Sequence, residues 1–125
     1  MAECPSILVV EDQEVVRAML SALLEARGFQ VDNASDGPSA VERAAERGYA
    51  AIVLDLVLPG RFDGLEACRL IRGLPMHART PVVVVSGRHD QDVRNRALAM
   101  GADRYFLKPY SAVALLRAIE GLARA

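Results

Sequence analysis

The sequence predicts an α/β protein built on a five-stranded parallel sheet with helices on both faces. Apolar runs alternate five times with segments whose apolar residues recur at helical spacing. Most of the runs are apolar at nearly every position, as expected of strands buried on both faces. The segments between them are long enough to be crossover helices, so that each strand can start at the same end of the sheet as the one before it. Such crossovers should be right-handed.

The expected strands lie at residues 7–10, 30–34, 50–54, 81–85 and 104–107. The fourth is rich in valine and is the clearest strand, because β-branched residues pack well on a pleated surface. The second is the weakest, since Asp32 alternates with Val31.

The expected helices lie at residues 14–26, 36–47, 64–72, 90–100 and 111–123. Asp36 or Ser35 caps the second helix and Ser111 caps the fifth, because these side chains can accept from the free amides of a first turn. Glycines at positions 28, 48 and 101 close three of the helices. No linker, internal repeat or low-complexity segment is evident.

Composition limits the classes of function. The chain has 125 residues, 52% of them hydrophobic, and a net charge of −1, which favours one globular domain without a nucleic-acid-binding surface. No apolar stretch is long enough to span a membrane and no signal peptide is recognisable, so we expect a cytoplasmic protein. Cys4 and Cys68 form neither a disulfide framework nor a zinc pattern. His77 and His89 are expected to be solvated loop residues.

Four of the five strands lead directly into ionisable or hydroxyl side chains. These are Glu11 and Asp12 after the first strand, Asp55 after the third, Ser86 after the fourth and Lys108 after the fifth. Parallel strands end at one edge of a sheet, so we expect these side chains to converge. Lys108 is notable because the other fourteen basic residues are arginines, and an ammonium acts as a compact point charge.

Such a cluster suits phosphoryl chemistry. Three carboxylates repel one another unless a cation lies among them, and oxygen ligands with room for water favour Mg²⁺ over Ca²⁺. The bound metal can take one phosphoryl oxygen, Lys108 can neutralise a second and Ser86 can donate to a third. No glycine-rich nucleotide loop follows the first strand, so the phosphoryl group must come from another molecule. Asp55, on the expected central strand, is the natural acceptor.

Each residue also has an ordinary explanation when it is taken alone. Glu11 and Asp12 can cap the helix that follows them, and Asp55 can open a turn before Leu-Pro-Gly. Ser86 can simply end a strand. Their joint occurrence at four strand ends favours a functional site over coincidence.

Four segments, in this order and spacing, carry a family resemblance: ILVVEDQEVVR, VLDLVLPGRFDGLEACRLIR, PVVVVSG and GADRYFLKPY. Over essentially its whole length the chain resembles the receiver domain of bacterial two-component response regulators. The resemblance implies a doubly wound, flavodoxin-like fold with five helices and the strand order 2-1-3-4-5. It also implies a single receiver domain over residues 1–125, without an output domain in this chain.

The resemblance implies the metal ligands. Asp12 would bind Mg²⁺ directly and Glu11 would act through water. Asp55 would be both a metal ligand and the residue that is phosphorylated. Val57 would offer its backbone carbonyl to the metal.

The resemblance also implies the residues that handle and report the phosphoryl group. Lys108 would pair with it, and Pro109 would follow that lysine through a peptide bond that is often cis in the family. Ser86 would be the switch hydroxyl and Tyr105 the switch aromatic. On phosphorylation Ser86 would move toward the new group and Tyr105 would turn inward.

The implied function is transfer of a phosphoryl group to Asp55 from a sensor histidine kinase or a histidine phosphotransfer protein, with Mg²⁺ as cofactor. The phosphorylated domain would signal through the surface of the fourth helix, fifth strand and fifth helix to a downstream protein target or output domain. It would not be an enzyme beyond self-catalysed phosphotransfer and slow autodephosphorylation.

The loop after Asp55 departs from the common family spacing. It holds one residue more, within Gly60-Arg61-Phe62, and we expect Phe62 or Arg61 to be a specificity contact for a partner. The alternative is a bulge without a role. Val57 and Arg88 occupy positions that flank the phosphoryl group in the family, and here they predict a long-lived phosphorylated state.

Three alternative functions belong to other classes of protein. An aspartyl-nucleophile phosphatase usually carries a second acid two residues after its nucleophile, where this chain has Val57. A receiver-like interaction module that is not regulated by phosphorylation usually lacks the acids or the lysine. A flavin-binding electron carrier would need a hydroxyl-rich loop after the first strand. The sequence leaves open the kinase, the output, a stand-alone or excised domain, and a homodimer through the last two helices.

Overall fold

The computed structural model describes residues 4–87 and 91–125. Its elements, in chain order, are β1 (Ser6–Val10), α1 (Glu14–Glu25), β2 (Gln30–Ala34), α2 (Gly37–Glu46), β3 (Ala51–Asp55), α3 (Gly64–Arg72), the short 3₁₀ helix η1 (Pro75–His77), β4 (Val82–Ser86), α4 (Gln91–Ala99), β5 (Arg104–Leu107) and α5 (Ala112–Ala123). The predicted elements are all present, and their ends coincide with the expected ones or differ from them by one residue.

The five strands form one parallel sheet in the order β2-β1-β3-β4-β5. The predicted fold class and strand order are therefore confirmed. The chain begins in the middle of the sheet, builds β2 on one side and then crosses to β3, so the order reverses beside β1. Ligands of open α/β sheets bind beyond the carboxyl ends of the strands at such a reversal.

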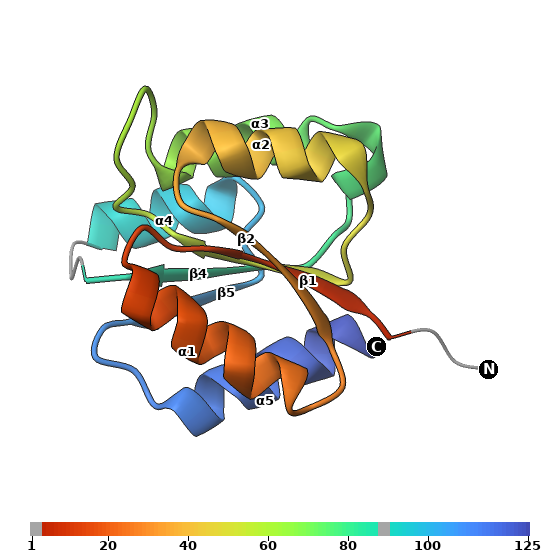
Figure 1. Ribbon diagram of the computed structural model, residues 1–125. Coiled ribbons are helices and arrows are strands. Elements are labelled where there is room, and N and C mark those ends of the chain that lie inside the picture. The colour runs from red at the N-terminus through yellow and green to blue at the C-terminus, as the bar shows by residue number, and fades with distance from the viewer. Residues whose placement is uncertain (1–3, 88–90) are drawn as a thin grey trace.

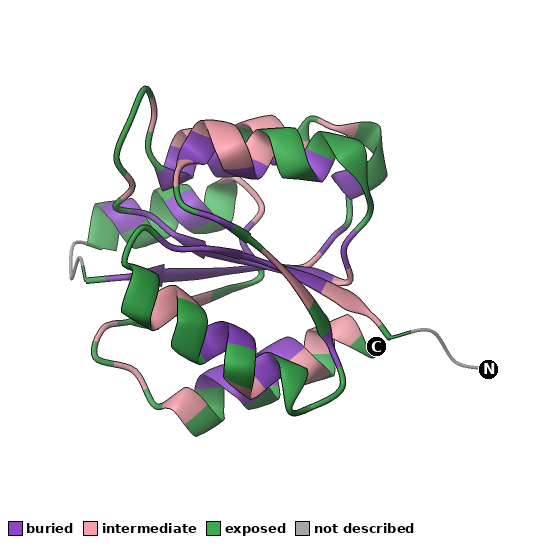
Figure 2. Cartoon of the chain, viewed as in Figure 1, coloured by how far each residue is buried: buried purple, intermediate pink, exposed green. Residues whose placement is uncertain are grey.

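Figure 1 shows α2, α3 and α4 on one face of the sheet and α1 and α5 on the other. Alternate side chains of each central strand therefore enter two separate cores. In β1, Leu8 and Val10 pack toward α2 and α3, whereas Ile7 and Val9 pack toward α1 and α5. Figure 2 shows the central strands as the most completely buried part of the chain. Burial on both faces explains why these strands are apolar at nearly every position.

Most of the expected helix boundaries are observed with their caps. Asp36 accepts from the Ser39 amide at 2.8 Å and Ser111 accepts from the Ala114 amide at 3.2 Å. Gly28 and Gly101 have positive φ values of 90° and 104°. The exception is the end of α2, where the expected Gly48 has no positive φ. The helix stops at Glu46 because Arg47 already adopts an extended conformation, with φ −157°.

The expectation for His77 was wrong, because its side chain is completely buried. Its Nε2 lies 2.9 Å from the Ala44 carbonyl oxygen and 3.1 Å from that of Arg47. Carbonyls only accept, so Nε2 is the donor to them, and Nδ1 lies 2.8 Å from the Thr80 hydroxyl oxygen. The imidazole thus joins the end of α2 to the loop before β4. His89, the other expected loop histidine, lies outside the described residues.

Arg72 makes a similar connection at the same end of the sheet. Its Nη1 donates to the carbonyl oxygens of His77 at 2.9 Å and Thr80 at 2.7 Å. Its Nη2 donates to the Gly101 carbonyl oxygen at 2.6 Å. One guanidinium therefore holds together the end of α3, the segment that leads into β4 and the turn before β5.

No helix in the part of the chain that the structure describes combines the length and the apolar character that crossing a membrane requires.

The start of α3 packs directly on the end of β3. The Gly64 amide donates to the Leu56 carbonyl at 3.0 Å, and a Cβ at this position would collide with the Asp55 carbonyl oxygen and lie 2.6 Å from the Leu56 Cα. Only glycine therefore allows α3 to approach the strand end that carries Asp55.

We predict that Gly64→Ala lowers the free energy of unfolding by about 3 kcal/mol, because the opposing atoms are backbone and cannot move without displacing the strand end. Urea unfolding monitored by circular dichroism measures the loss. The matched control is Gly121→Ala in α5, where nothing lies within 4 Å of the added Cβ. This control should be neutral or more stable by roughly 0.5 kcal/mol. Equal effects of the two substitutions would contradict the close-packing argument.

Candidate functional site

The acidic pair stands where β1 meets α1. Glu11 is buried and Asp12 is exposed. The Glu11 amide donates to the Ala34 carbonyl at 3.0 Å, which continues the β1–β2 pairing by one residue. Its carboxylate accepts from the Gln13 amide at 2.9 Å. The turn from strand to helix therefore holds the Glu11 carboxylate at the carboxyl edge of the sheet.

Asp55 is the last residue of β3 and is 3% exposed. Its Oδ1 accepts from the Val57 amide at 2.9 Å, and its Oδ2 accepts from the Lys108 ammonium at 2.6 Å. The two oxygens thus have different partners, a backbone amide of the following loop and a cation from another strand end. Val57 itself is 60% exposed.

Lys108 follows β5 and reaches across the end of β4 to Asp55 on β3. Its Nζ also lies 3.6 Å from Glu11 Oε1. Partial burial lowers the pKa of the ammonium, but the hydrogen bond to Asp55 and the charges of Asp55 and Glu11 outweigh it. The pKa of Lys108 is therefore raised above its usual value. The Lys108–Pro109 peptide bond is cis.

Glu11, Asp12 and Asp55 each offer a carboxylate oxygen, and these oxygens lie within 4.8 Å of one another. Burial is the main cause that raises the pKa of Glu11 to about 7, and the Asp55 charge adds to it. One ammonium does not balance three carboxylates. Three oxygen ligands with an exposed member suit a hard divalent cation that keeps several waters, which fits Mg²⁺.

Ser86 is the last residue of β4 and is completely buried. The Lys108 amide donates to its carbonyl at 2.8 Å, so the fourth and fifth strand ends are joined just behind the ammonium. Tyr105, in the middle of β5, is half-buried against the core shared with α4. The Arg94 guanidinium of α4 lies 6.0 Å from the centre of its ring. Ser86 thus lies at the end of β4 next to Lys108, and Tyr105 lies on β5 next to α4.

In the loop between β3 and α3, the two residues expected to contact a partner differ in how far they are buried. Phe62 is half-buried and packs on Gly37 at the start of α2, where a Cβ would meet the ring at 2.6 Å. Arg61 is exposed, with its guanidinium 6.0 Å from the centre of the Phe62 ring. Phe62 therefore anchors the loop and Arg61 is the residue free to meet a partner. Arg88, the other residue expected beside the phosphoryl group, lies outside the described residues.

Comparison with known proteins identifies the family. The family model of the response regulator receiver domain matches residues 7–120. This chain belongs to the response regulator receiver domain family. The fold described above is thus that of a receiver domain, a signalling module of two-component systems.

Curated relatives of this receiver domain are transcriptional regulators. The phosphate regulon transcriptional regulatory protein PhoB of Rhizobium meliloti is 39% identical over 120 residues, which are 96% of this chain and 52% of that protein. The transcriptional regulatory protein SrrA of Staphylococcus aureus is 34% identical over 118 residues, or 94% of this chain and 47% of that protein. The receiver domain therefore spans about half the length of these relatives.

Solved structures agree with the fold. The receiver domain of the sensor histidine kinase PA1611 from Pseudomonas aeruginosa superposes with a TM-score of 0.87 at 31% identity, covering 98% of this chain and all of that one. That structure holds a magnesium ion in its active-site cleft. The chemotaxis protein CheY4 of Vibrio cholerae has a TM-score of 0.88 at 24% identity, over 96% of this chain and 99% of that one, and shares the fold.

The structure adds two side chains to the candidate site that the sequence did not indicate. Arg17 donates to the carbonyl oxygens of Glu11 and Asp12. Tyr110 is half-buried two residues after Lys108, and burial raises the pKa of its hydroxyl. The position of Arg17 in the sequence could have indicated that it has a specific partner. A cation in the first turn of a helix opposes the helix dipole and therefore calls for a specific partner.

The raised pKa of Glu11 predicts how stability depends on pH in metal-free buffer. The folded protein keeps the Glu11 proton up to about pH 7, whereas the unfolded chain loses it near 4.5. The folded state therefore binds more protons in this window, and the contribution of Glu11 is complete below pH 4.5 and is lost as the pH rises through 7.

Glu11→Gln mimics the protonated side chain and should remove this dependence. Relative to the variant, the wild type should lose on the order of 2 kcal/mol of unfolding free energy between pH 4.5 and 8. Urea unfolding of both proteins in the presence of EDTA gives the two curves. Parallel curves across that range would show that Glu11 ionises as easily in the folded protein as in the unfolded chain.

Proposed function

We propose that this receiver domain is a phosphoacceptor that takes a phosphoryl group onto Asp55. The observation that carries the proposal is the position of Lys108 Nζ, 2.6 Å from Asp55 Oδ2 within a cluster of three carboxylates. A solitary ammonium directed at one buried carboxylate, beside oxygens that suit a divalent cation, matches the needs of phosphoryl transfer.

The transfer begins on a phosphohistidine of a sensor histidine kinase or a histidine phosphotransfer protein. An Asp55 carboxylate oxygen attacks phosphorus, a new O–P bond forms and the N–P bond breaks. The electron pair of that bond stays on the imidazole nitrogen of the donor. Lys108 stays beside the acceptor and neutralises a phosphoryl oxygen during the transfer.

Asp12, Asp55 and the Val57 carbonyl would hold Mg²⁺, with Glu11 acting through water. The bound ion supplies positive charge at the phosphoryl oxygens. Without it, Asp55 accepts a dianionic group next to two other carboxylates, which repel it. We therefore propose that phosphorylation depends on Mg²⁺.

Phosphorylation adds about −1.5 to −2 charges beside the end of β4. Ser86 moves toward the new acceptor oxygens and Tyr105 turns inward, which alters the surface made by α4, β5 and α5. That surface would carry the signal to a downstream protein or an output domain. The matched relatives are transcriptional regulatory proteins about twice the length of the matched region, which agrees with an output domain as the target. We also propose that a homodimer can form through α4 and α5. We propose a cytoplasmic location for such a protein.

Arg61 is our proposed specificity contact for the phosphoryl donor, with Phe62 as its support. This develops the expectation for the longer loop, since Phe62 is packed on Gly37 and Arg61 is exposed. Replacing either residue by alanine should slow transfer from the cognate donor and leave phosphorylation by a small-molecule donor unchanged. An unchanged rate from the cognate donor in both variants would remove the proposal.

A receiver-like module without phosphorylation and an aspartyl-nucleophile phosphatase are the alternatives. Val57 stands where such a phosphatase would need a general acid, and a valine cannot transfer a proton. The acids and the lysine are all in place, which favours phosphorylation over a module that has lost it.

We predict that incubation with acetyl phosphate and MgCl₂ adds one phosphoryl group, detected by intact-protein mass spectrometry. Asp55→Asn should abolish the gain because the amide is not a nucleophile, and EDTA should prevent it. Lys108→Ala should slow it by about 10²-fold, the order expected for loss of one charge-stabilising donor. Ser111→Ala, which affects only the cap of α5, is the matched control and should be phosphorylated at the wild-type rate. Turnover of many phosphoester substrates would instead support the phosphatase.

We also predict a phosphorylated state that persists rather than decaying quickly. Val57 cannot activate water beside Asp55, and Arg88 is long and cationic. Arg88→Ala and Val57→Asn should therefore shorten the half-life of phosphorylated protein, measured by phosphate release after removal of the donor. An unchanged half-life in both variants would mean that these side chains do not control access of water.

A further inference from the structure

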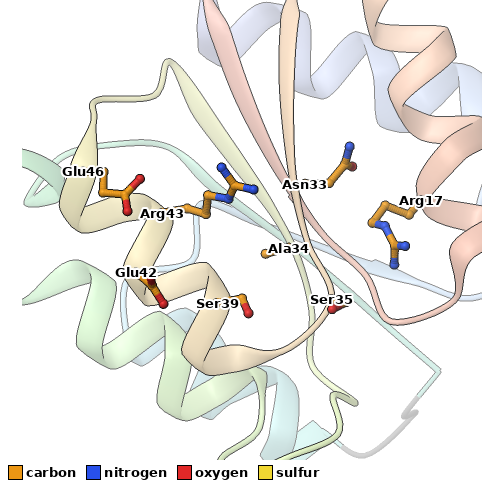
Figure 3. A pocket seen from close by; sticks show the side chains of 8 residues that line it. All are labelled: Arg17, Asn33, Ala34, Ser35, Ser39, Glu42, Arg43 and Glu46. Carbon is orange, nitrogen blue, oxygen red and sulfur yellow. The ribbon is translucent and has the colours of Figure 1, made fainter.

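Arg17 connects α1 to the loop that carries the acidic pair. It lies in the first turn of α1, and its Nη1 donates to the Glu11 carbonyl oxygen at 2.8 Å and to that of Asp12 at 3.4 Å. Figure 3 shows it on one side of an open polar groove of about 540 Å³, with Arg43 of α2 on the opposite side. Two arginines thus border one groove, but only one of them touches the acidic loop among the residues that the structure describes.

The bonds of Arg17 complete a set that surrounds Glu11. The Glu11 amide donates to Ala34 at 3.0 Å, its carboxylate accepts from the Gln13 amide at 2.9 Å, and its carbonyl accepts from Arg17. The backbone and the side chain of Glu11 are therefore both held in place. Asp12 is exposed, and its carbonyl accepts a longer bond from Arg17.

The charge of Arg17 is unfavourable at this position. A cation in the first turn opposes the positive end of the helix dipole, and it also repels a divalent cation at the neighbouring carboxylates. Its geometric effect has the opposite sign, because fixing the two carbonyls keeps the Glu11 and Asp12 carboxylates near Asp55. The two effects can therefore be separated by the direction in which metal affinity changes.

We propose that Arg17 is a positioning residue for the metal site. It holds the loop between β1 and α1 in the conformation that brings the carboxylates of Glu11 and Asp12 within reach of Asp55. The inference rests on the proposed function, since it requires that this acidic cluster bind Mg²⁺.

The test is isothermal titration calorimetry with MgCl₂ at pH 8, on wild type, Arg17→Ala, Arg17→Lys and the control Arg43→Ala. Arg17→Ala should raise the dissociation constant about tenfold, the low end of the effect of residues that orient metal ligands. Arg17→Lys should recover part of the affinity, because an ammonium still donates to a carbonyl. Arg43→Ala removes the same charge from the other side of the groove and should bind Mg²⁺ as well as wild type or slightly better.

A second readout needs no metal. In metal-free protein, amide hydrogen exchange of Gln13 should become about fivefold faster in Arg17→Ala, because the carboxylate that accepts from this amide is no longer held. Exchange in Arg43→Ala should equal that of wild type. If Arg17→Ala does not fold, as judged by circular dichroism, Arg17→Met keeps the packing of the stem and carries the same test.

The outcomes separate the two proposals. If Arg17→Ala binds Mg²⁺ as tightly as or more tightly than wild type, in step with Arg43→Ala, then Arg17 acts through charge alone and the inference is overturned. If wild type binds no Mg²⁺ at millimolar concentration, the proposed function fails and the inference fails with it. Weaker binding in Arg17→Ala alone, at an unchanged melting temperature, supports both.

Discussion

The organisation of this receiver domain depends on the contact between one ammonium and one buried carboxylate. Lys108 and Asp55 stand on strand ends that are separated by β4, and the lysine stem is long enough to cross that strand. Three carboxyl groups share this one ammonium, so the cluster carries a net negative charge once all three are ionised. This negative charge favours binding of a metal ion. If protein cations already balanced the carboxylates, that attraction would be lost.

The sequence was sufficient for the class of the fold and for the convergence of the site. Runs that are apolar at every position require a sheet covered on both faces, and a parallel sheet brings all strand ends to one edge. That geometry brings Asp55 and Lys108 to the same edge of the sheet, but how close they lie depends on the strand order. The strand order itself came from the family resemblance, since periodicity does not say on which side of β1 the chain places β2.

Other features were beyond the sequence because they depend on contacts between distant segments. The burial of His77 requires two carbonyls at the end of α2, some thirty residues earlier, and no local pattern announces them. The end of α2 was misjudged for the same reason, since Arg47 turns extended where its carbonyl meets His77. Phe62 could be recognised as unusual, but only the position of Gly37 shows that its ring faces inward.

Arg72 and His77 have a consequence for how the molecule deforms. Both bind backbone carbonyls at the amino ends of the strands, and together they join α2, α3 and the segments before β4 and β5. These hydrogen bonds therefore cross-link that end of the domain. We expect a displacement that starts at the opposite end of the strands to appear as tilting of the helices about this end, and not as translation of whole layers.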